Sequence, residues 1–562
     1  MRRVKVLAVL LLALVAASAA NPAERLRRRH AAGMEARIPE GMLAAMHNVS
    51  DERIRADVKL LSSDEMEGRG TGAHGGELAA AYIAAQFKAA GVEPAGDNGG
   101  YLQRVPLVGE STLPATSLQL KSARGVTTLR QFDDAMIFNL DRRESADVRG
   151  DLIFIGYGIT APEFGWDDYA GVDVKGKVLL MLVSEPPSED PQFFGGKALT
   201  YYGRWTYKFE QAARMGAAGV ILIHKTEMAS YGWDVVRSSW SGERASLADD
   251  PDPKLGVAAW ARWESASAIL SECGMSLDEM VAAAGRKGFH AVPLPVTVTA
   301  HVASAVRRFE SANVIGKVSG SDPELKQQAI FFTGHYDHLG MRADAAGKTI
   351  YHGALDNATG AAIVMEMARA VAAAQVRPKR TLYFVATTAE EQGLWGSVYL
   401  VRHLPVPLAE ASLDVNFDSI KPLGIPREVQ ADGVERTSIA ALFDQTAADF
   451  KMTVLPPQHP EAGGYFRSDH FSFARQGVPA FSIEPGERFG GHPESWVRAE
   501  NEAMNASYHQ PTDEYKEEYD YRTDAVMARF GIALGYRVGA LRDAVQWKAG
   551  DEFGSMRKGQ AR

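Results

Sequence analysis

Short apolar runs alternate with helical patterns from residue 305 onward. Runs at 330–333, 382–386, 413–417 and 480–483 are typical of buried strands, and helical spacing of apolar positions predicts helices over 360–374 and 437–450. Strands that alternate with helices in this way predict a mostly parallel mixed sheet flanked by helices, an α/β fold. Residues 546–562 are charged and contain glycine, so we expect a frayed tail there.

The first part of the chain has a different pattern. Residues 21–50 predict a helical lead-in, and Ile54, Val58 and Leu61 lie at the spacing of an amphipathic helix. A second helix is expected over 77–90. The glycine-rich stretch between these helices matches the spacing of a dinucleotide-binding motif. No strand precedes it, as that motif requires, so we interpret the stretch as a surface loop.

The middle of the chain predicts a separate, smaller domain. Apolar runs at 152–158, 176–183 and 216–223 alternate with glycine turns, and one helix is expected over 207–215. The segment contains no cluster of reactive residues. We therefore predict an inserted β-rich or α/β domain at 131–304.

The N-terminus has the composition of a secretory signal peptide. Arg2, Arg3 and Lys5 precede an unbroken apolar run at 6–17, and small residues follow at 17–20. The run is short for a transmembrane helix, although an uncleaved anchor is the alternative. We expect residues 1–20 to be removed and the mature protein to be secreted or periplasmic, without further contact with the membrane.

The length and the net charge limit the number of domains and the kinds of partner that we expect. A chain of 562 residues is too long for one compact core, which favours two or three domains. The net charge of -9 gives no indication of a nucleic-acid partner. Cys273 is the only cysteine, so an intramolecular disulfide is impossible.

The chemistry-bearing residues follow the predicted strands. In open α/β sheets, ligands bind outside the carboxyl ends of the strands. One histidine and several carboxylates stand just past three of these ends, and two further candidates stand in loops. The strand-end residues are His335, Asp337, Glu390, Glu391 and Asp418, and the loop residues are Asp356 and His509.

These donors are carboxylate oxygens and imidazole nitrogens without a thiolate, a set that suits zinc, cobalt or manganese. They exceed the needs of one zinc ion and suit two ions that share one carboxylate. Glu390 and Glu391 are adjacent, so one can bind metal while the other accepts a proton from water. The Asp337 carboxylate can hold the second N–H of His335. We interpret His338 and His352 as structural.

The ordered motifs resemble peptidase family M28, the zinc aminopeptidases. The resemblance covers about 51–130 and 305–545, and the middle segment is similar to the protease-associated domain that is often inserted in this family. It implies a lead-in and first peptidase part at 21–130, an insertion at 131–304, the main peptidase part at 305–545 and a tail at 546–562. The motifs that carry it are at 334–340, 353–360, 389–393, 416–419, 468–471 and 508–513.

The resemblance also implies roles for the site residues. Glu390 is the implied general base and later the acid, Asp337 orients His335, and Tyr508 donates to the developing oxyanion. The implied cofactors are two divalent ions, most simply Zn²⁺, and the implied substrates are peptides cleaved at the N-terminal bond. One ion is bound by His335 and Asp418, the other by Glu391 and His509, with Asp356 as the bridge.

Two alternatives stay open. A carboxypeptidase or dipeptidase on the same fold would need arginines for the substrate carboxylate, and Arg467, Arg475 and Arg488 are available. A binding module with an inactive site would have lost ligands, whereas all of them are present. Aromatic residues at 465–466, Phe471, Phe489 and Trp496 are candidates for a hydrophobic side-chain pocket.

Overall fold

The computed structural model describes residues 40–344 and 347–559. The predicted signal peptide at 1–20 and most of the predicted lead-in lie outside the described residues. Within the described part of the chain, no helix has the length and apolar character needed to cross a membrane.

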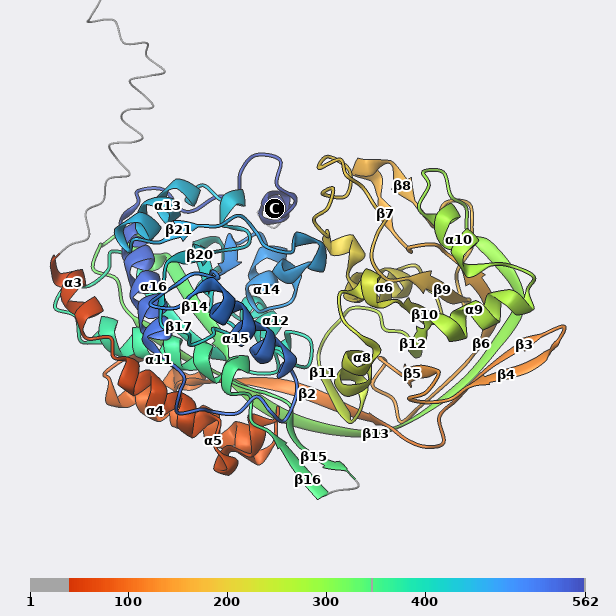
Figure 1. Ribbon diagram of the computed structural model, residues 1–562, viewed down its shortest axis with the longest axis horizontal. Helices are drawn as coiled ribbons and strands as arrows, with labels where there is room; N and C mark the ends of the chain where they lie inside the picture. The colour runs from red at the N-terminus through yellow and green to blue at the C-terminus, as the bar shows by residue number, and fades with distance from the viewer. Residues whose placement is uncertain (1–39, 345–346, 560–562) are drawn as a thin grey trace, which may run out of the picture.

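A 15-stranded mixed sheet joins two lobes (Figure 1). We call residues 40–112 and 305–559 the large lobe and residues 113–304 the small lobe. The centre of the large lobe contains four neighbouring parallel strands, which confirm the strands expected from the sequence. In sheet order they are β22 (Ala480–Ser482), β18 (Ala411–Asn416), β14 (Ala329–His335) and β17 (Thr381–Thr387).

One long strand, β13 (Val292–Val318), connects the lobes. Its C-terminal part pairs with β17 in the large lobe, and its N-terminal part pairs with β6 (Ser145–Phe154) in the small lobe. Between them it pairs with β2 (Leu102–Thr112), and both strands run along the base of the molecule in Figure 1. The boundary predicted between residues 304 and 305 therefore falls inside a strand, without a linker.

Helices pack against the sheet of the large lobe. The most buried is α11 (Thr359–Ala372), which confirms the helix expected over 360–374. The other helices are α3 (Glu40–His47), α4 (Asp51–Leu61), α5 (His74–Ala89), α12 (Trp395–Arg402), α13 (Ala440–Asp449), α14 (His470–Arg475), α15 (Glu494–Ala506), α16 (Arg522–Ala540) and α17 (Glu552–Gly559).

The expected frayed tail is wrong for the residues around α17. Trp547 and Phe553 are buried, and their rings lie 5.5 Å apart. Asp551 accepts a 2.7 Å hydrogen bond from the Arg436 side chain. These apolar and ionic contacts outweigh the charged, glycine-containing composition, and they hold the segment against the large lobe.

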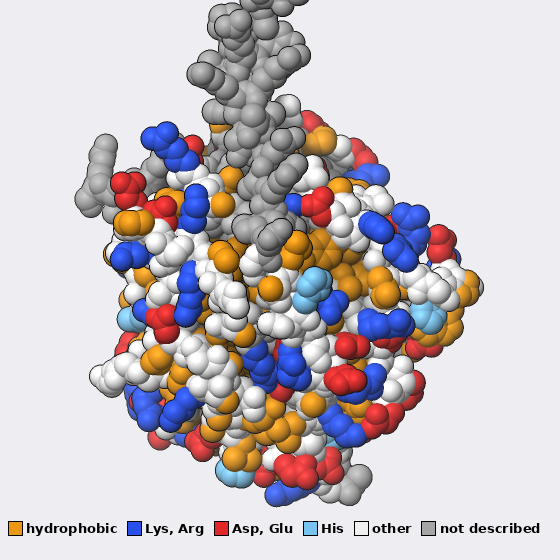
Figure 2. All heavy atoms as spheres, turned by 90° about the vertical axis from the view of Figure 1, so that its left-hand side faces the viewer, with side chains coloured by type: hydrophobic (Ala, Val, Ile, Leu, Met, Phe, Trp, Pro, Cys, Tyr) orange, Lys and Arg blue, Asp and Glu red, His pale blue; other side chains and the backbone are white. Residues whose placement is uncertain are grey.

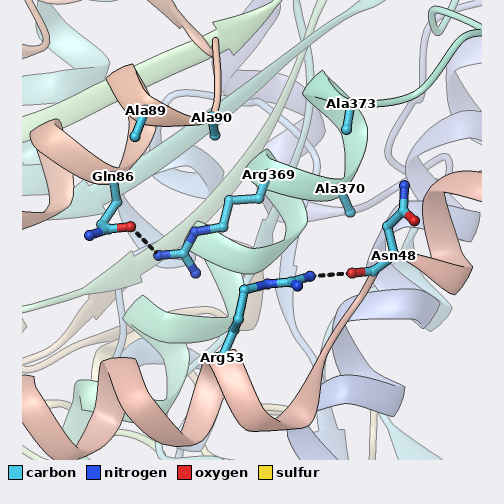
Figure 3. A pocket seen from close by; sticks show the side chains of 8 residues that line it. All are labelled: Asn48, Arg53, Gln86, Ala89, Ala90, Arg369, Ala370 and Ala373. Atoms are coloured by element: carbon cyan, nitrogen blue, oxygen red, sulfur yellow. Dashed lines mark hydrogen bonds between the residues drawn. The ribbon is translucent and has the colours of Figure 1, made fainter.

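Paired arginines attach the N-terminal helices to α11. Arg53 donates to Glu366 at 3.0 Å, and Arg369 donates to Asp57 and, at 2.9 Å, to Gln86. A hollow of about 430 Å³ lies between these side chains (Figure 3). Both arginines have acidic partners, so we interpret the residues around this hollow as a packing contact between the N-terminal helices and α11. On the face shown in Figure 2, acidic and basic side chains are interspersed.

The small lobe has a parallel core of its own. Here β6, β9 (Val178–Leu182), β10 (Gly219–His224) and β12 (Val257–Arg262) are parallel neighbours. The antiparallel strands β3 (Ser117–Ser122) and β4 (Gly125–Leu129) also pack with this lobe, although the predicted boundary lay after them. Its remaining elements include β5 (Ala135–Phe138), β11 (Glu243–Leu247), α6 (Trp205–Arg214), α8 (Trp233–Trp240), α9 (Trp263–Glu272) and α10 (Leu277–Ala284).

Candidate metal centre

Three parallel strands bring the first group of predicted ligands together. His335 is the last residue of β14, and Asp418 follows β18 by two residues. The His335 Nε2 atom is 3.3 Å from an oxygen of Asp418, 3.3 Å from one of Asp356 and 3.9 Å from one of Glu390. Because parallel strands end at one edge of the sheet, residues more than eighty positions apart share a single small space.

A second group shares Asp356 with the first. The His509 Nε2 atom lies 3.2 Å from the other oxygen of Asp356 and 3.0 Å from an oxygen of Glu391. Asp356 thus presents one oxygen toward His335 and one toward His509. This is the arrangement that a carboxylate bridging two cations requires.

The main chain holds Asp356 in place between the two histidines. The carboxylate of Asp513 accepts the backbone N–H groups of Leu355 at 2.9 Å and of Asp356 at 3.0 Å. The next side chain, Asn357, donates to the carbonyl of Phe417 at 2.9 Å. The peptide bond between Asp356 and Asn357 is cis. Asp513 therefore supports the site from outside it, by fixing the loop.

Asp337 contacts the site differently from the sequence prediction. The His335 Nδ1 atom is 3.1 Å from the backbone carbonyl oxygen of Asp337, but 3.8 Å from its carboxylate. The carboxylate instead accepts the Thr71 hydroxyl at 2.8 Å and the backbone N–H of Glu390 at 3.1 Å. Asp337 thus orients His335 through its carbonyl and positions the Glu390 loop through its side chain.

The adjacent glutamates turn toward different partners. Glu390 lies near His335, whereas Glu391 lies against His509 and His338. Burial raises the pKa of Glu390 well above its usual range, and the charges of Glu391 and Asp418 act in the same direction against the opposing effect of His335. Burial also opposes the charge of Glu391, but His509 and His338 lower its pKa to about 2. The two neighbours therefore suit different tasks.

His338 is a site residue that the sequence analysis left as structural. Its Nδ1 atom lies 2.7 Å from Glu391, and its imidazole, Asp356 and Glu391 form a group able to hold a cation. His338 is fully buried, and its Nε2 atom has no hydrogen-bond partner among the described residues. In the sequence, the only indication that His338 belongs to the site is its position three residues after His335. The predicted strand does not show which way the side chain of a histidine in the following loop points.

Arg69 is a second residue that the sequence analysis missed. It is fully buried and donates to the carbonyls of Tyr336 at 2.6 Å, His352 at 2.7 Å and Gly353 at 2.7 Å. These carbonyls belong to the loops that carry the ligands. The glycine-rich stretch at 67–72 is therefore a buried support under the site, where a surface loop was expected.

Tyr508 lies beside the second group. Its ring stacks on that of His509, with centroids 3.9 Å apart, and 48% of the residue is exposed. It lines a cavity of about 290 Å³ together with Asp356 and Lys421. The side chain is therefore accessible to a molecule that enters this cavity.

The expected aromatic pocket is not at this place. Phe466 and Phe471 are buried in a hydrophobic core cluster, and Phe489 is buried in another. Trp496 stacks on His492 instead. The cavity beside Asp356 is lined by other residues, which are Leu355, Asp356, Ser419, Lys421, Met504, Asn505, Ser507, Tyr508 and Asp513.

The carboxylates of the site have no basic partner other than histidine among the described residues. Asp356, Glu390, Glu391 and Asp418 form no ion pair with a lysine or arginine among the described residues; their ionic partners are histidines. Several carboxylates this close together and this buried are costly without compensating charge. Two divalent ions, each facing an imidazole and sharing Asp356, fit this donor set.

Comparison with known proteins agrees with this geometry. Residues 313–534 match the model of peptidase family M28. The chain is 29% identical over 248 residues to a probable zinc metalloprotease of Pyrenophora tritici-repentis, covering 37% of this chain and 46% of that protein. It is 28% identical over 245 residues to leupeptin-inactivating enzyme 1 of Streptomyces exfoliatus, covering 43% and 51%. The chain thus spans about half the length of these relatives.

A solved structure has the same fold over most of the chain. The aminopeptidase from Aneurinibacillus sp. strain AM-1 superposes with a TM-score of 0.51 at 18% identity, covering 90% of this chain and 96% of that one. The fold and the site together define a mixed α/β protein with paired imidazole–carboxylate groups at the ends of its parallel strands. Within the large lobe, residues 313–534 are similar to peptidase family M28.

Proposed function

We propose that the chain is a two-metal aminopeptidase that hydrolyses the N-terminal bond of peptides. The observation that carries this proposal is the position of Asp356, whose two oxygens lie 3.3 Å from His335 and 3.2 Å from His509. The match of residues 313–534 to family M28 supports it, as do relatives named as a probable zinc metalloprotease and a leupeptin-inactivating enzyme. Zinc is the proposed metal, because the donors are imidazoles and carboxylates.

The proposed ligands divide between the two ions. His335 and Asp418 hold one ion, Glu391 and His509 hold the other, and Asp356 is shared. When bound, such a pair of ions polarises the scissile carbonyl and lowers the pKa of the attacking water. The chain's own part is to fix these ligands, which it does through Asp513 under the Asp356 loop.

Glu390 is the proposed proton carrier. Its carboxylate accepts the proton of the attacking water and later donates it to the leaving amine. Burial raises the pKa of Glu390 above its usual range, which favours a carboxyl group that both accepts and returns a proton. Tyr508, half exposed beside His509, is the proposed donor to the developing oxyanion.

The substrate's α-amine requires a negative group near the scissile bond. Asp418 is the most accessible of the ligand carboxylates, with 18% of its side chain exposed, against 3% for Glu391 and 7% for Asp356. The Ser468 hydroxyl donates to Asp418 at 2.6 Å and fixes its orientation. Asp418 and Glu390 are therefore the proposed contacts of the amine.

Hydrolysis of aminoacyl p-nitroanilides tests this proposal directly. The protein should release nitroaniline from substrates with a free amine, release should stop with a chelator, and it should return when zinc is added. The matched control is the same anilide with an acetylated amine. Cleavage of the acetylated substrate at an equal rate would contradict an aminopeptidase. Absence of both cleavage and bound metal would favour an inactive binding module.

We further propose that the protein is exported and that the small lobe, similar in sequence to a protease-associated domain, restricts access to the site. N-terminal sequencing of the mature protein tests the first point, since cleavage near residue 20 is expected. A folded protein and a short peptide with the same N-terminal residues test the second point. Equal rates on both would contradict restriction by the small lobe.

A further inference from the structure

The two lobes meet close to the metal centre along a defined seam. The backbone N–H of Leu199 in the small lobe donates to the carbonyl of Pro460 at 2.9 Å. Arg475 donates to Glu210 at 3.1 Å, and the rings of Tyr201 and Phe471 lie 4.9 Å apart. The small-lobe segment before α6 is therefore held against the loop that precedes α14 in the large lobe.

Two arginines meet at this seam without an acidic partner. Arg204, the residue before α6, forms no ion pair or side-chain hydrogen bond among the described residues, and its Nε atom is buried. Within the described part of the chain, the Nε atom of Arg467 is also buried without a hydrogen-bond partner, and the only hydrogen bond of the Arg467 side chain, at 2.7 Å, is to the carbonyl of Ala462. The guanidinium of Arg467 also lies over the Tyr231 ring at 5.6 Å.

The other arginines considered for a substrate carboxylate are already paired. Arg475 is occupied by Glu210, and Arg488 is occupied by Glu428. Of the three, only Arg467 has no carboxylate partner among the residues that the structure describes, and Arg204 of the small lobe lies near it. Burial and the nearby charge of Arg467 lower the pKa of Arg204 to about 10.

This arginine pair adjoins the proposed reaction centre. Arg467 directly precedes Ser468, whose hydroxyl contacts Asp418 at 2.6 Å. Tyr508 interacts electrostatically with both arginines and stacks on His509. Arg467 is therefore the sequence neighbour of a residue that contacts the proposed ligand Asp418.

Two neighbouring, partly buried cations are unfavourable unless an anion compensates them. Arginine presents a planar set of donors that matches a carboxylate. We propose that Arg204 and Arg467 together bind a carboxylate of the peptide substrate, and so select short peptides with a free C-terminus or peptides with an acidic residue near the cleaved bond. This inference rests on the proposed function and adds a substrate class to it.

Matched peptides distinguish the two sources of the carboxylate. One series has leucine at the N-terminus and pairs Leu-Ala with Leu-Ala-amide, and Leu-Ala-Ala with its amide. A second series pairs Leu-Asp-amide with Leu-Asn-amide. We expect kcat/KM to be about 10- to 100-fold higher for the charged member of at least one pair, the effect of a hydrogen bond to a charged group. The pair that responds identifies the source.

Substitution of the two arginines then tests whether they cause the preference for charged peptides. In Arg204→Gln and Arg467→Gln, the ratio between charged and uncharged members should fall toward one. The ratio is insensitive to partial misfolding, because a folding defect lowers both rates equally. Arg498→Gln, an exposed position on α15, is the matched control and should keep the wild-type ratio.

The outcomes separate the two proposals. Equal rates on charged and uncharged peptides in the wild type overturn the carboxylate site but leave the aminopeptidase intact. A wild-type preference that survives in both variants also overturns it. If leucine p-nitroanilide and every peptide resist hydrolysis by zinc-loaded protein, the proposed function fails and this inference fails with it.

Discussion

The large and small lobes have similar parallel cores but balance their buried charges differently. In the small lobe, the fully buried Lys208 is electrostatically coupled to the carboxylates of Asp168 and Glu185. In the large lobe, the ionic partners of the carboxylates around Asp356 are histidines, and no lysine or arginine pairs with them among the described residues. The small lobe thus contains its own counter-charge, whereas the large lobe requires cations from outside.

This difference in charge balance indicates which lobe can bind metal ions. The carboxylates of the small lobe have filled hydrogen-bonding positions: Glu185 accepts the backbone N–H of Thr200 at 2.9 Å, and Asp168 accepts the Trp166 indole at 2.9 Å. The carboxylates of the large lobe converge on a partly open edge beside a cavity of about 290 Å³. A buried lysine thus accompanies the acids of the small lobe, whereas the acids around Asp356 have no such lysine among the described residues and can bind a metal ion.

The largest expected effect comes from removing the acid assigned to proton transfer. Glu390→Gln should lower kcat by about 10²- to 10⁴-fold, because general acid–base catalysis contributes a factor of this size. The bound metal, measured by elemental analysis, should stay unchanged, since Glu390 is not a proposed ligand. Loss of one ion per chain together with activity would instead make Glu390 a ligand and break the proposed division between the two glutamates.

Metal removal should affect the two lobes unequally. At a free zinc concentration of about 100 times the dissociation constant, binding stabilises the folded state by about 2.7 kcal/mol. Chelation should therefore lower the melting temperature and speed amide exchange in the loops after β14, β17 and β18. Exchange in β9 and β10 should change little. Equal acceleration in both lobes would show that the charge difference does not localise the metal's effect.

The pH dependence of stability tests the internal compensation in the small lobe. Burial lowers the pKa of Lys208 to about 7, with Glu185 and Asp168 acting in the opposite direction. The unfolded chain keeps this lysine protonated up to about pH 10. Between pH 7 and 10 the unfolded state therefore binds more protons, and Lys208 should add up to about 1.4 kcal/mol of stability per pH unit.

Lys208→Met should remove this rise in stability above pH 7. Burial raises the pKa of Glu185 to about 7 and that of Asp168 to about 6, so the folded state binds more protons than the unfolded state between about pH 4 and 7. Without the lysine, stability should fall as pH rises through 7. Urea denaturation at several pH values measures the pH dependence of the free energy of unfolding in the wild type and in Lys208→Met. The double variant Lys208→Met/Glu185→Gln is the control, and it should show a smaller loss of stability with rising pH. Parallel curves for wild type and Lys208→Met would contradict the coupling.

The sequence predicted the strands of the large lobe and the residues at their ends, because apolar runs and the chemistry that follows them are local features. The frayed tail was wrong, because the buried rings of Trp547 and Phe553 and the hydrogen bond from Arg436 to Asp551 hold the segment against the large lobe. The boundary at 304 could not be predicted to fall inside a strand, since β13 continues from one core into the other. Arg204 and Arg467 lie 263 positions apart, and only the packing of the lobes brings them together.

The smallest expected effect concerns His338, the site residue that local pattern could not identify. Its Nδ1 atom is 2.7 Å from Glu391, so it can support that carboxylate or replace His509 as a ligand. If it is a support, His338→Ala should weaken binding of one ion by about 10- to 100-fold, the usual cost of losing such a partner. His509→Ala should abolish that ion altogether, and titration of the chelated protein with zinc compares the two. The reverse order would make His338 the ligand and His509 the support, and would move the second ion to the buried side of Asp356.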